Sequence, residues 1–168
     1  MNSIISLNIS RFLLLVLVQV IVLNNINFLG YINPYPYILF ILLYPINNNR
    51  ALFIFLSFML GLTIDLFSDS GGVHAAASVT LAYIRPVFLK SSFGTMYEHQ
   101  TIKISSAEIG QRLTYFSIAT LIHHIILFSF EVFSASKILL IIKKSLFSSI
   151  FTIILCLIIT ILFSRKPK

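Results

Sequence analysis

Charged side chains are scarce in this chain of 168 residues: 10% are charged and only five are acidic. An ordinary soluble domain has about 25% charged residues, and a disordered chain has low hydrophobicity. The sequence fits neither class, because 58% of its residues are hydrophobic and its mean hydropathy is +0.97. We therefore expect one integral membrane domain over residues 1–168, with no room for a large water-soluble module.

Cysteine and the usual catalytic motifs are also scarce. The single Cys156 excludes an intramolecular disulfide and a metal motif built on cysteine pairs. The sequence shows no nucleophile–base pair, glycine-rich phosphate loop or paired carboxylates, so we expect no enzymatic activity, no metal and no cofactor. The net charge of +7 is scattered over loops and helix ends, which argues against nucleic-acid binding and favours contact with anionic membrane lipids.

Long apolar runs predict an all-α, polytopic transmembrane bundle of about six helices, since one span needs ~20 mostly apolar residues. The second predicted helix is too short to cross alone, so a tilted, broken or re-entrant segment and a count of five spans stay open. Residues 90–112 are the longest polar stretch and are expected to form a cytoplasmic loop. The six predicted helices cover residues 11–28, 35–46, 51–67, 73–89, 113–130 and 145–163.

The basic residues predict the orientation of these helices. Arg11 precedes an apolar run, but no small-residue cleavage site follows, which favours an uncleaved first helix over a signal peptide. With the N-terminus inside, nine basic residues lie on the inner side and three, Lys137, Lys143 and Lys144, on the outer side. Positive charge near helix ends favours the cytoplasm, so both termini are expected there.

Asp65 is the only charged residue within residues 51–67, and an ionised group at the bilayer centre costs ~2.5–3.5 kcal/mol on insertion scales. Gly61, Asp65 and Asp69 are spaced four residues apart and share one helix face. We expect His74 to be the local partner of Asp65, and Asp69 to cap the following helix. This polar face is either a structural clamp that closes the helical hairpin or a surface that binds a partner or couples a motion.

Three further polar residues lie within predicted helices. Arg85 is expected to reach the headgroups with its long side chain, a buried pair with an acid being the alternative, and Pro86 to kink or end its helix. His123 and His124 are neighbours on one helix and point ~100° apart. Interhelical hydrogen bonds are therefore expected of them rather than a metal site.

A resemblance to a known family is carried by three stretches, which read LVLVQVIVLNNINFLGYINPY (15–35), FMLGLTIDLFSDSGGVHAAASVTLAYIRP (58–86) and LIHHIILFSFEVF (121–133). The most specific part is the core G-L-x-x-D-L-x-S-x-x-x-G-x-H-A, which begins at Gly61 and ends at Ala75. The chain resembles the family of the rod-shape-determining membrane protein MreD, in a form typical of Bacteroidetes-like bacteria, over nearly its whole length.

The resemblance implies a non-enzymatic, multi-pass component of the bacterial cytoplasmic (inner) membrane. Such a protein helps to organise lateral peptidoglycan synthesis with MreC, MreB, RodA and its class-B transpeptidase. In the expected mechanism, the Gly61/Asp65 face beside residues 75–78 docks a transmembrane helix of a partner, foremost that of MreC.

The resemblance also implies a likeness in fold to the substrate-binding S components of energy-coupling vitamin transporters. The alternative function is therefore a binder of a vitamin-like small molecule. Its pocket would be polar and close to the outer face. The candidate pocket residues are Asn24, Asn25, Asn27, Asn33, Asp69 and His74.

Overall fold

The computed structural model describes residues 2–26, 30, 32–46, 49–98, 102 and 104–163, which form helices joined by turns and irregular segments. The predicted all-α class is confirmed. Five long helices make up most of the fold: α1 (Asn2–Ile21), α3 (Arg50–Ser68), α4 (Val73–Phe93), α6 (Ile109–Val132) and α7 (Ile138–Phe163). The shorter elements are α2 (Leu39–Leu43), α5 (Thr95–Glu98) and the 3-10 turns Leu23–Asn25, Pro36–Ile38, Ile104–Ser106 and Ala135–Lys137.

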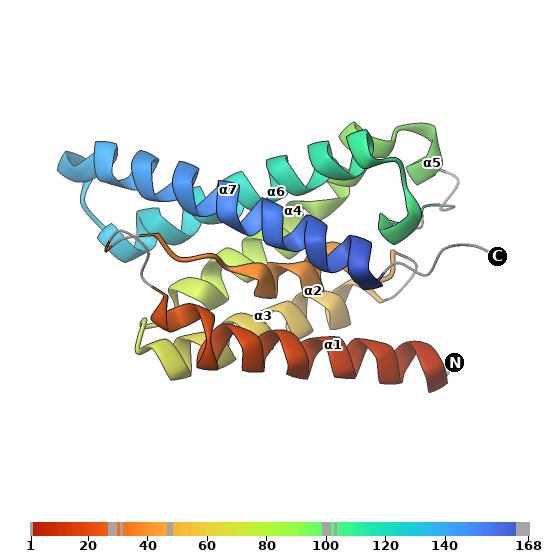
Figure 1. Ribbon diagram of the computed structural model, residues 1–168, viewed down its shortest axis with the longest axis horizontal. Helices are drawn as coiled ribbons and strands as arrows, with labels where there is room; N and C mark the ends of the chain where they lie inside the picture. Colours follow the sequence, from red (N-terminus) through yellow and green to blue (C-terminus); the bar gives the residue numbers. More distant parts are fainter. Residues whose placement is uncertain are drawn as a thin grey trace.

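The long helices lie alongside one another in a bundle (Figure 1). Helix α3 packs on α4, α4 on α6 and α6 on α7, while α1 packs against α3. The helices α3, α4, α6 and α7 alternate in direction, and the start of α1 and the end of α7 lie at the same end of the bundle (Figure 1). The two ends of the described fold therefore lie on one side of the bundle.

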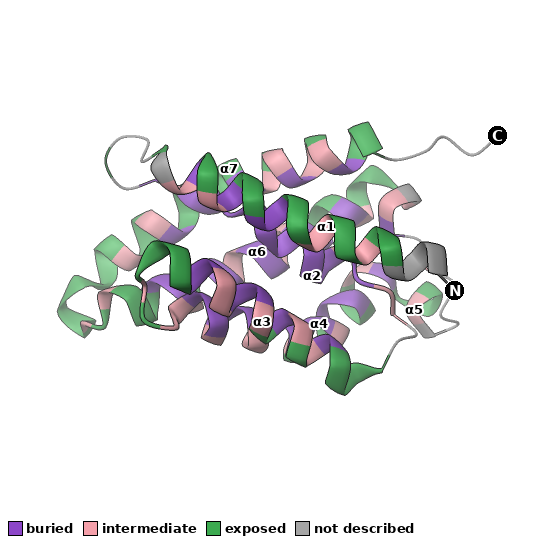
Figure 2. Ribbon diagram, turned by 90° about the horizontal axis from the view of Figure 1, so that it is seen from below, coloured by how far each residue is buried: buried purple, intermediate pink, exposed green. Residues whose placement is uncertain are grey.

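The helices carry their polar residues on the inside, which is the reverse of a soluble protein. Helix α7 exposes isoleucine, leucine and phenylalanine side chains to its surroundings, from Ile138 to Phe163. Small side chains let helices approach one another closely in lipid, where burial of apolar surface gives no drive for association. Figure 2 shows exposed outward faces on α1 and α7 and buried faces toward the centre. The buried face of α7 consists of Ser145, Ser148, Ser149, Thr152, Cys156 and Thr160.

Length and composition make this chain a membrane protein. Among the residues that the structure describes, three helices are long and apolar enough to cross a bilayer: Arg50–Ser68, Ile109–Val132 and Ala135–Phe163. The apolar part of α1, Ser6–Ile21, is shorter than these three helices. A soluble monomer rarely exposes contiguous apolar patches of this extent, so the outward faces of these helices are suited to lipid.

In place of the predicted second helix, residues 32–46 form an irregular segment that is only partly helical. We call it the inner segment. It runs along the bundle in contact with α1, α4 and α7 (Figure 1). Only Pro36–Ile38 and α2 are helical in it. Pro34 and Pro45 lack a backbone N–H and disfavour a longer helix, while Pro36 is tolerated as the first residue of its turn. Extended residues advance about 3.3 Å each, against about 1.5 Å in an α-helix, so the inner segment reaches farther than a helix of equal length.

Protein surrounds the inner segment on all sides. Residues 34–42 are all buried. Non-helical backbone at membrane depth is tolerated only where protein or a water-filled cavity covers it. The inner segment meets this condition, so it can lie within a membrane protein although it is only partly helical.

The predicted helix boundaries are correct where turn residues mark them. Helix α3 matches the prediction within one residue at each end, and α4 begins at Val73 as predicted. The turn between them contains Gly71 and Gly72, both with positive φ, of 67° and 95°. Pro86 does not end α4, which continues to Phe93.

The first and the last predicted helix have wrong bounds. The first helix spans Asn2–Ile21 and not residues 11–28, because Asn24 enters a 3-10 turn and bonds Gln19 and Ser68 with its side chain. Residues 27–29 lie outside the described part. Helix α7 begins at Ile138 and not at residue 145, because the helix carries Lys143 on its exposed side and Lys144 in an ion pair.

The predicted cytoplasmic loop, residues 90–112, is partly helical. Helix α4 extends into it as far as Phe93, Thr95–Glu98 and Ile104–Ser106 form short helical turns, and α6 begins at Ile109. Arg112 lies in the first turns of α6 and donates to the Ser105 carbonyl oxygen at 2.9 Å. Residues 99–101 and 103 lie outside the described part.

Gly61 marks a close approach of α3 to α4. A Cβ atom built on Gly61 would lie 2.5 Å from Ala75 Cα and 2.6 Å from Ala75 N, and it would also meet the His74 carbonyl oxygen. These neighbours are backbone atoms, which a side-chain rotation cannot move aside. The sequence therefore needs glycine at residue 61 for this hairpin to close.

Gly61→Ala is expected to lower the free energy of unfolding by about 1–3 kcal/mol, the usual cost of overpacking. Thermal unfolding of the detergent-solubilised protein, followed by circular dichroism, measures the change. Gly110→Ala is the matched control, since Gly110 is also helical and nothing lies within 4 Å of its Cβ position; it should be neutral or slightly stabilising. Equal unfolding temperatures for the two variants would contradict the close approach.

Candidate functional site

Asp65 caps the N-terminus of α4 from the neighbouring helix. Its Oδ1 accepts hydrogen bonds from the His74 amide at 3.0 Å and from Ser70 Oγ at 2.6 Å. Its Oδ2 accepts from the Ala75 amide at 2.8 Å. The first amides of a helix have no partner within the helix and carry a partial positive charge. A carboxylate that is 5% exposed therefore replaces the missing cap.

The structure corrects one expectation about this hairpin, the cap by Asp69, and confirms the other, that His74 is a partner of Asp65. Asp69 does not cap α4: it is exposed, ends α3 with φ of 50°, and leaves the cap position to Gly72, which has no side chain. Asp65 reaches His74 through its backbone amide and not through its imidazole. Sequence spacing placed both acids on one face but did not show which of them the turn brings over the start of α4.

The Gly61/Asp65 face is internal to the chain. Helix α4 covers Gly61, and the carboxylate of Asp65 is buried against the first turn of α4. The expected docking of a partner's helix on this face is therefore not possible in this structure. The geometry is that of a hydrogen-bonded clamp that closes the α3–α4 hairpin.

Arg85 binds the end of the inner segment. Its Nη2 donates to the carbonyl oxygens of Leu42, at 3.1 Å, and Tyr44, at 2.5 Å, and its Nε donates to Tyr115 Oη at 3.0 Å. Tyr115 Oη donates in turn to the Leu42 carbonyl oxygen at 3.2 Å. The guanidinium also lies 5.0 Å from the centre of the Phe53 ring.

The predicted location of Arg85 at the headgroups is wrong, and so is the alternative of a pair with an acid. The side chain is 3% exposed and is held by carbonyl oxygens. These carbonyls lie at the C-terminal end of α2, where a helix leaves its last acceptors free and carries a partial negative charge. A cation is favourable at this position for the same reason that Asp65 is favourable at the start of α4.

A cluster of aromatic and imidazole side chains fills the centre of the bundle. Tyr37 Oη lies 2.9 Å from His74 Nδ1 and 3.1 Å from His123 Nε2; we call this arrangement the imidazole–phenol bridge. The Tyr35 ring lies 5.3 Å from that of His74 and 5.5 Å from that of His124, centre to centre. The cluster joins the inner segment to α4 and α6.

His123 and His124 take part in interhelical contacts, as predicted. His124 Nδ1 donates to the Thr120 carbonyl oxygen at 2.7 Å, and its Nε2 lies 3.4 Å from Thr152 Oγ1 on α7. The Tyr35 amide donates to the same Thr152 oxygen at 2.9 Å. His123 contacts the inner segment through the imidazole–phenol bridge. The two neighbouring histidines thus point to different elements.

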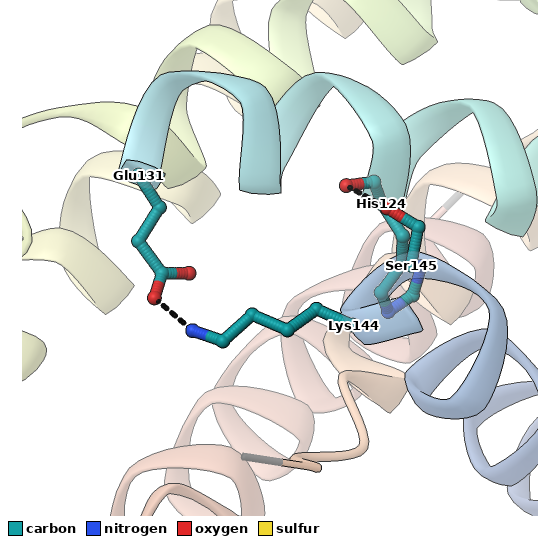
Figure 3. A network of polar contacts seen from close by, with 4 residues as sticks. All are labelled: His124, Glu131, Lys144 and Ser145. Atoms are coloured by element: carbon teal, nitrogen blue, oxygen red, sulfur yellow. Dashed lines mark hydrogen bonds and ion pairs between the residues drawn. The ribbon is translucent and has the colours of Figure 1, made fainter. Parts of the chain in front are cut away.

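Two polar contacts join the C-terminal half of α6 to the first turns of α7 (Figure 3). Lys144 Nζ donates to Glu131 Oε1 at 2.6 Å, and Ser145 Oγ donates to the His124 carbonyl oxygen at 3.3 Å. Glu131 is 40% exposed, and a surface ion pair of this kind contributes about 0–1 kcal/mol. The pair involves Lys144 of α7, a residue that lies just before the predicted start of this helix at residue 145.

Sequence reasoning missed the partners on the inner segment. Tyr35 and Tyr37 stand on either side of Pro36, and alternate residues of extended or 3-10 chain point in different directions. A tyrosine within a buried segment needs a hydrogen-bond partner for its hydroxyl group. That rule, applied to Tyr37 and the two predicted helix histidines, is the signal that was available.

The chemistry that the cluster supports is hydrogen bonding and proton exchange. In the described ranges, no group of three or more histidine, cysteine, aspartate or glutamate residues is placed to hold a metal ion. Two surface hollows of about 820 and 290 Å³ lie on the outward face of α1 and at the α6–α7 turn. Asn24, Asn33, Asp69 and His74 line neither of them; Asn27 and the side chain of Asn25 lie outside the described part.

Comparisons of the chain with protein families, with curated proteins and with solved structures find no match. The fold and the composition define an all-α membrane protein. The likeness to the MreD family and to the transporter S components stays a prediction from the sequence.

Asp65→Asn should destabilise the fold by about 2–4 kcal/mol, because an amide offers one acceptor oxygen where the carboxylate offered two, and charged hydrogen bonds and helix caps are each worth about 1–3 kcal/mol. Asp69→Asn is the control and should leave stability unchanged, since Asp69 is exposed and asparagine tolerates a left-handed backbone. Unfolding temperature in detergent is the measurement. A larger effect at Asp69 would refute the capping role of Asp65.

Arg85→Met is expected to cost about 1–3 kcal/mol, because it removes the donor to the buried Tyr44 carbonyl oxygen, while the Leu42 carbonyl oxygen keeps the hydroxyl group of Tyr115. Arg50→Met is matched to it: Arg50 also donates to a carbonyl oxygen, that of Tyr83, and lies over an aromatic ring, but it is exposed. Its loss should cost less than about 1 kcal/mol. Denaturant unfolding in mixed micelles compares the two, and similar costs would contradict the structural role of Arg85.

Proposed function

We propose that this chain is a non-enzymatic, multi-pass scaffold of the bacterial inner membrane, with both termini in the cytoplasm. In this role it organises lateral peptidoglycan synthesis and maintains rod shape together with MreC, MreB, RodA and its class-B transpeptidase. The proposal rests on the resemblance to the MreD family and on the part that the resembling residues play in the fold.

The observation that carries the proposal is the role that residues of the G-L-x-x-D-L-x-S-x-x-x-G-x-H-A core play in the fold. Gly61 admits α4, Asp65 caps it, Gly72 supplies the left-handed residue before it, and His74 bonds the inner segment. Ala75 receives the close approach of Gly61. The specific residues of the resemblance thus build a hairpin, which fits a protein that acts by its shape.

Partners must then contact the outward faces of the helices. Leu17 on α1, Leu66 on α3 and Ile154 on α7 are 56%, 75% and 49% exposed. In lipid, specificity between helices comes from packing and from a few hydrogen bonds. Faces rich in large apolar side chains supply the packing surface, and the buried polar groups hold the fold that presents it.

Affinity purification of the tagged protein from native membranes tests the proposal, with the recovered proteins identified by mass spectrometry. MreC, MreB, RodA and the class-B transpeptidase are expected, and depletion of the protein should convert rods into rounded cells. A photo-crosslinking residue placed singly at Leu17, Leu66 or Ile154 should capture one of these partners from at least one position.

A tagged, unrelated membrane protein of similar abundance is the control for nonspecific recovery. Failure to recover any of the four partners, together with unchanged cell shape on depletion, would overturn the proposal. Stoichiometric co-purification of a vitamin-like molecule in that case would favour the S-component alternative.

A further inference from the structure

One hydroxyl group fastens the inner segment to two helices. In the imidazole–phenol bridge, Tyr37 Oη is shared between His74 on α4 and His123 on α6. Tyr37 and His123 are fully buried, and His74 is 5% exposed. The bridge is therefore screened from water, and its hydrogen bonds depend on the protons that its three members carry.

The number of protons decides whether the bridge can form. A phenol has one hydrogen to donate, and an imidazole nitrogen accepts a hydrogen bond only when it is unprotonated. Tyr37 therefore donates to one imidazole and accepts from the other. When His74 and His123 both carry a full complement of protons, both are donors, neither imidazole can accept the phenol hydrogen, and two positive charges flank one hydroxyl group.

The groups around His74 offset part of one positive charge, but less than its burial costs. Asp65 faces it from α3 and Glu131 from α6. The oxygens of Asp65 are already bonded to the start of α4, and Glu131 is bonded to Lys144 of α7. Tyr35 on the inner segment is neutral at physiological pH, since tyrosine ordinarily titrates near pH ~10.

The groups around His123 offset none. The titratable side chains that act on it are the imidazoles of His74 and His124. Its second ring nitrogen, Nδ1, has no hydrogen-bond partner in the described residues. A protonated His123 would carry an N–H there with nothing described to accept it. A second proton on the pair is therefore costly while the inner segment stays in place.

The inner segment depends on such side-chain bonds because its own backbone makes few. Its helical part is short, and three prolines remove backbone donors. The half around Pro34 is held by Gln19, which donates to the Pro34 carbonyl oxygen at 3.2 Å, by Thr152 and by the bridge. The other half is held by Arg85 and Tyr115, which are not members of the bridge.

We propose that the imidazole–phenol bridge is a proton-operated latch. It holds residues 32–38 in the bundle while at most one of the two imidazoles is charged, and it releases them when His74 and His123 are both protonated. The latch is independent of the proposed scaffold function. Released imidazoles in contact with water titrate near pH ~6.5, so opening is favoured as the pH falls below that value.

Hydrogen–deuterium exchange of the purified protein in lipid nanodiscs tests the latch at pH 7.5 and pH 5.0. Exchange rates of residues 32–43 are divided by the intrinsic rate at each pH. An opening that takes up one proton becomes ~10-fold more favourable per pH unit below the free titration point. The wild type should therefore show about tenfold or more additional opening at pH 5.0.

Three variants locate the sensor. Tyr37→Phe should abolish the added opening at pH 5.0, because it removes the shared hydroxyl group. His123→Gln should reduce it, because it replaces one of the two imidazoles with a group that does not titrate. Tyr115→Phe is the matched control, because it removes a hydroxyl group that also holds the inner segment but has no imidazole partner. It should raise exchange equally at both pH values and keep the pH dependence.

The outcomes separate clearly. Equal pH dependence in the wild type and in Tyr37→Phe, or a flat wild-type profile, overturns the proposal. Nitrogen-15 spectra of labelled histidine give a second measurement that needs no variant, since the chain has four histidines. At pH 7.5, Nδ1 of His74 and Nε2 of His123 should show opposite protonation states, one bearing a hydrogen and the other not. The same state at both nitrogens contradicts the bridge.

Discussion

A peptide group outside a helix needs a hydrogen-bond partner inside a membrane protein, and the inner segment imposes that requirement here. Gln19 and Thr152 serve its first half, at Pro34 and Tyr35, and Arg85 serves the carbonyls that follow α2. The helices that surround the inner segment therefore carry polar residues at the depths where its backbone needs them. The polar residues inside the bundle are thus arranged around the irregular backbone of the inner segment.

Two buried charged side chains are each stabilised by the partial charges at one end of a helix. The carboxylate of Asp65 lies at the first amides of α4, and the guanidinium of Arg85 lies at the carbonyls that end α2. Each charge is satisfied by partial charges of the backbone and not by an ion of opposite sign. Buried acids and bases in this chain are thus tertiary helix caps, which leaves them unavailable to an external partner.

The sequence predicted the parts of the fold that local rules control. Turn glycines marked the α3–α4 hairpin, and helix spacing placed Gly61 and Asp65 on one face. It could not predict the beginning of α7, because an ion pair with Glu131 allows lysines within the helix, nor the burial of Arg85, because its acceptors come from residues 42 and 44. Before the path of the turn is known, Asp65 and Asp69 are equally good candidates for the residue that caps α4. Each error concerns a contact between residues that are distant in sequence.

The hydroxyl-lined inner face of α7 has a consequence for how this chain can vary. Outward isoleucines and leucines of α7 meet fluid acyl chains, which adapt to a side chain of another size. Ser148, Ser149 and Thr152 meet fixed neighbours, and a leucine in their place would push α7 off the bundle. Natural selection on this helix should therefore preserve small, unremarkable hydroxyl residues and let its large apolar residues drift.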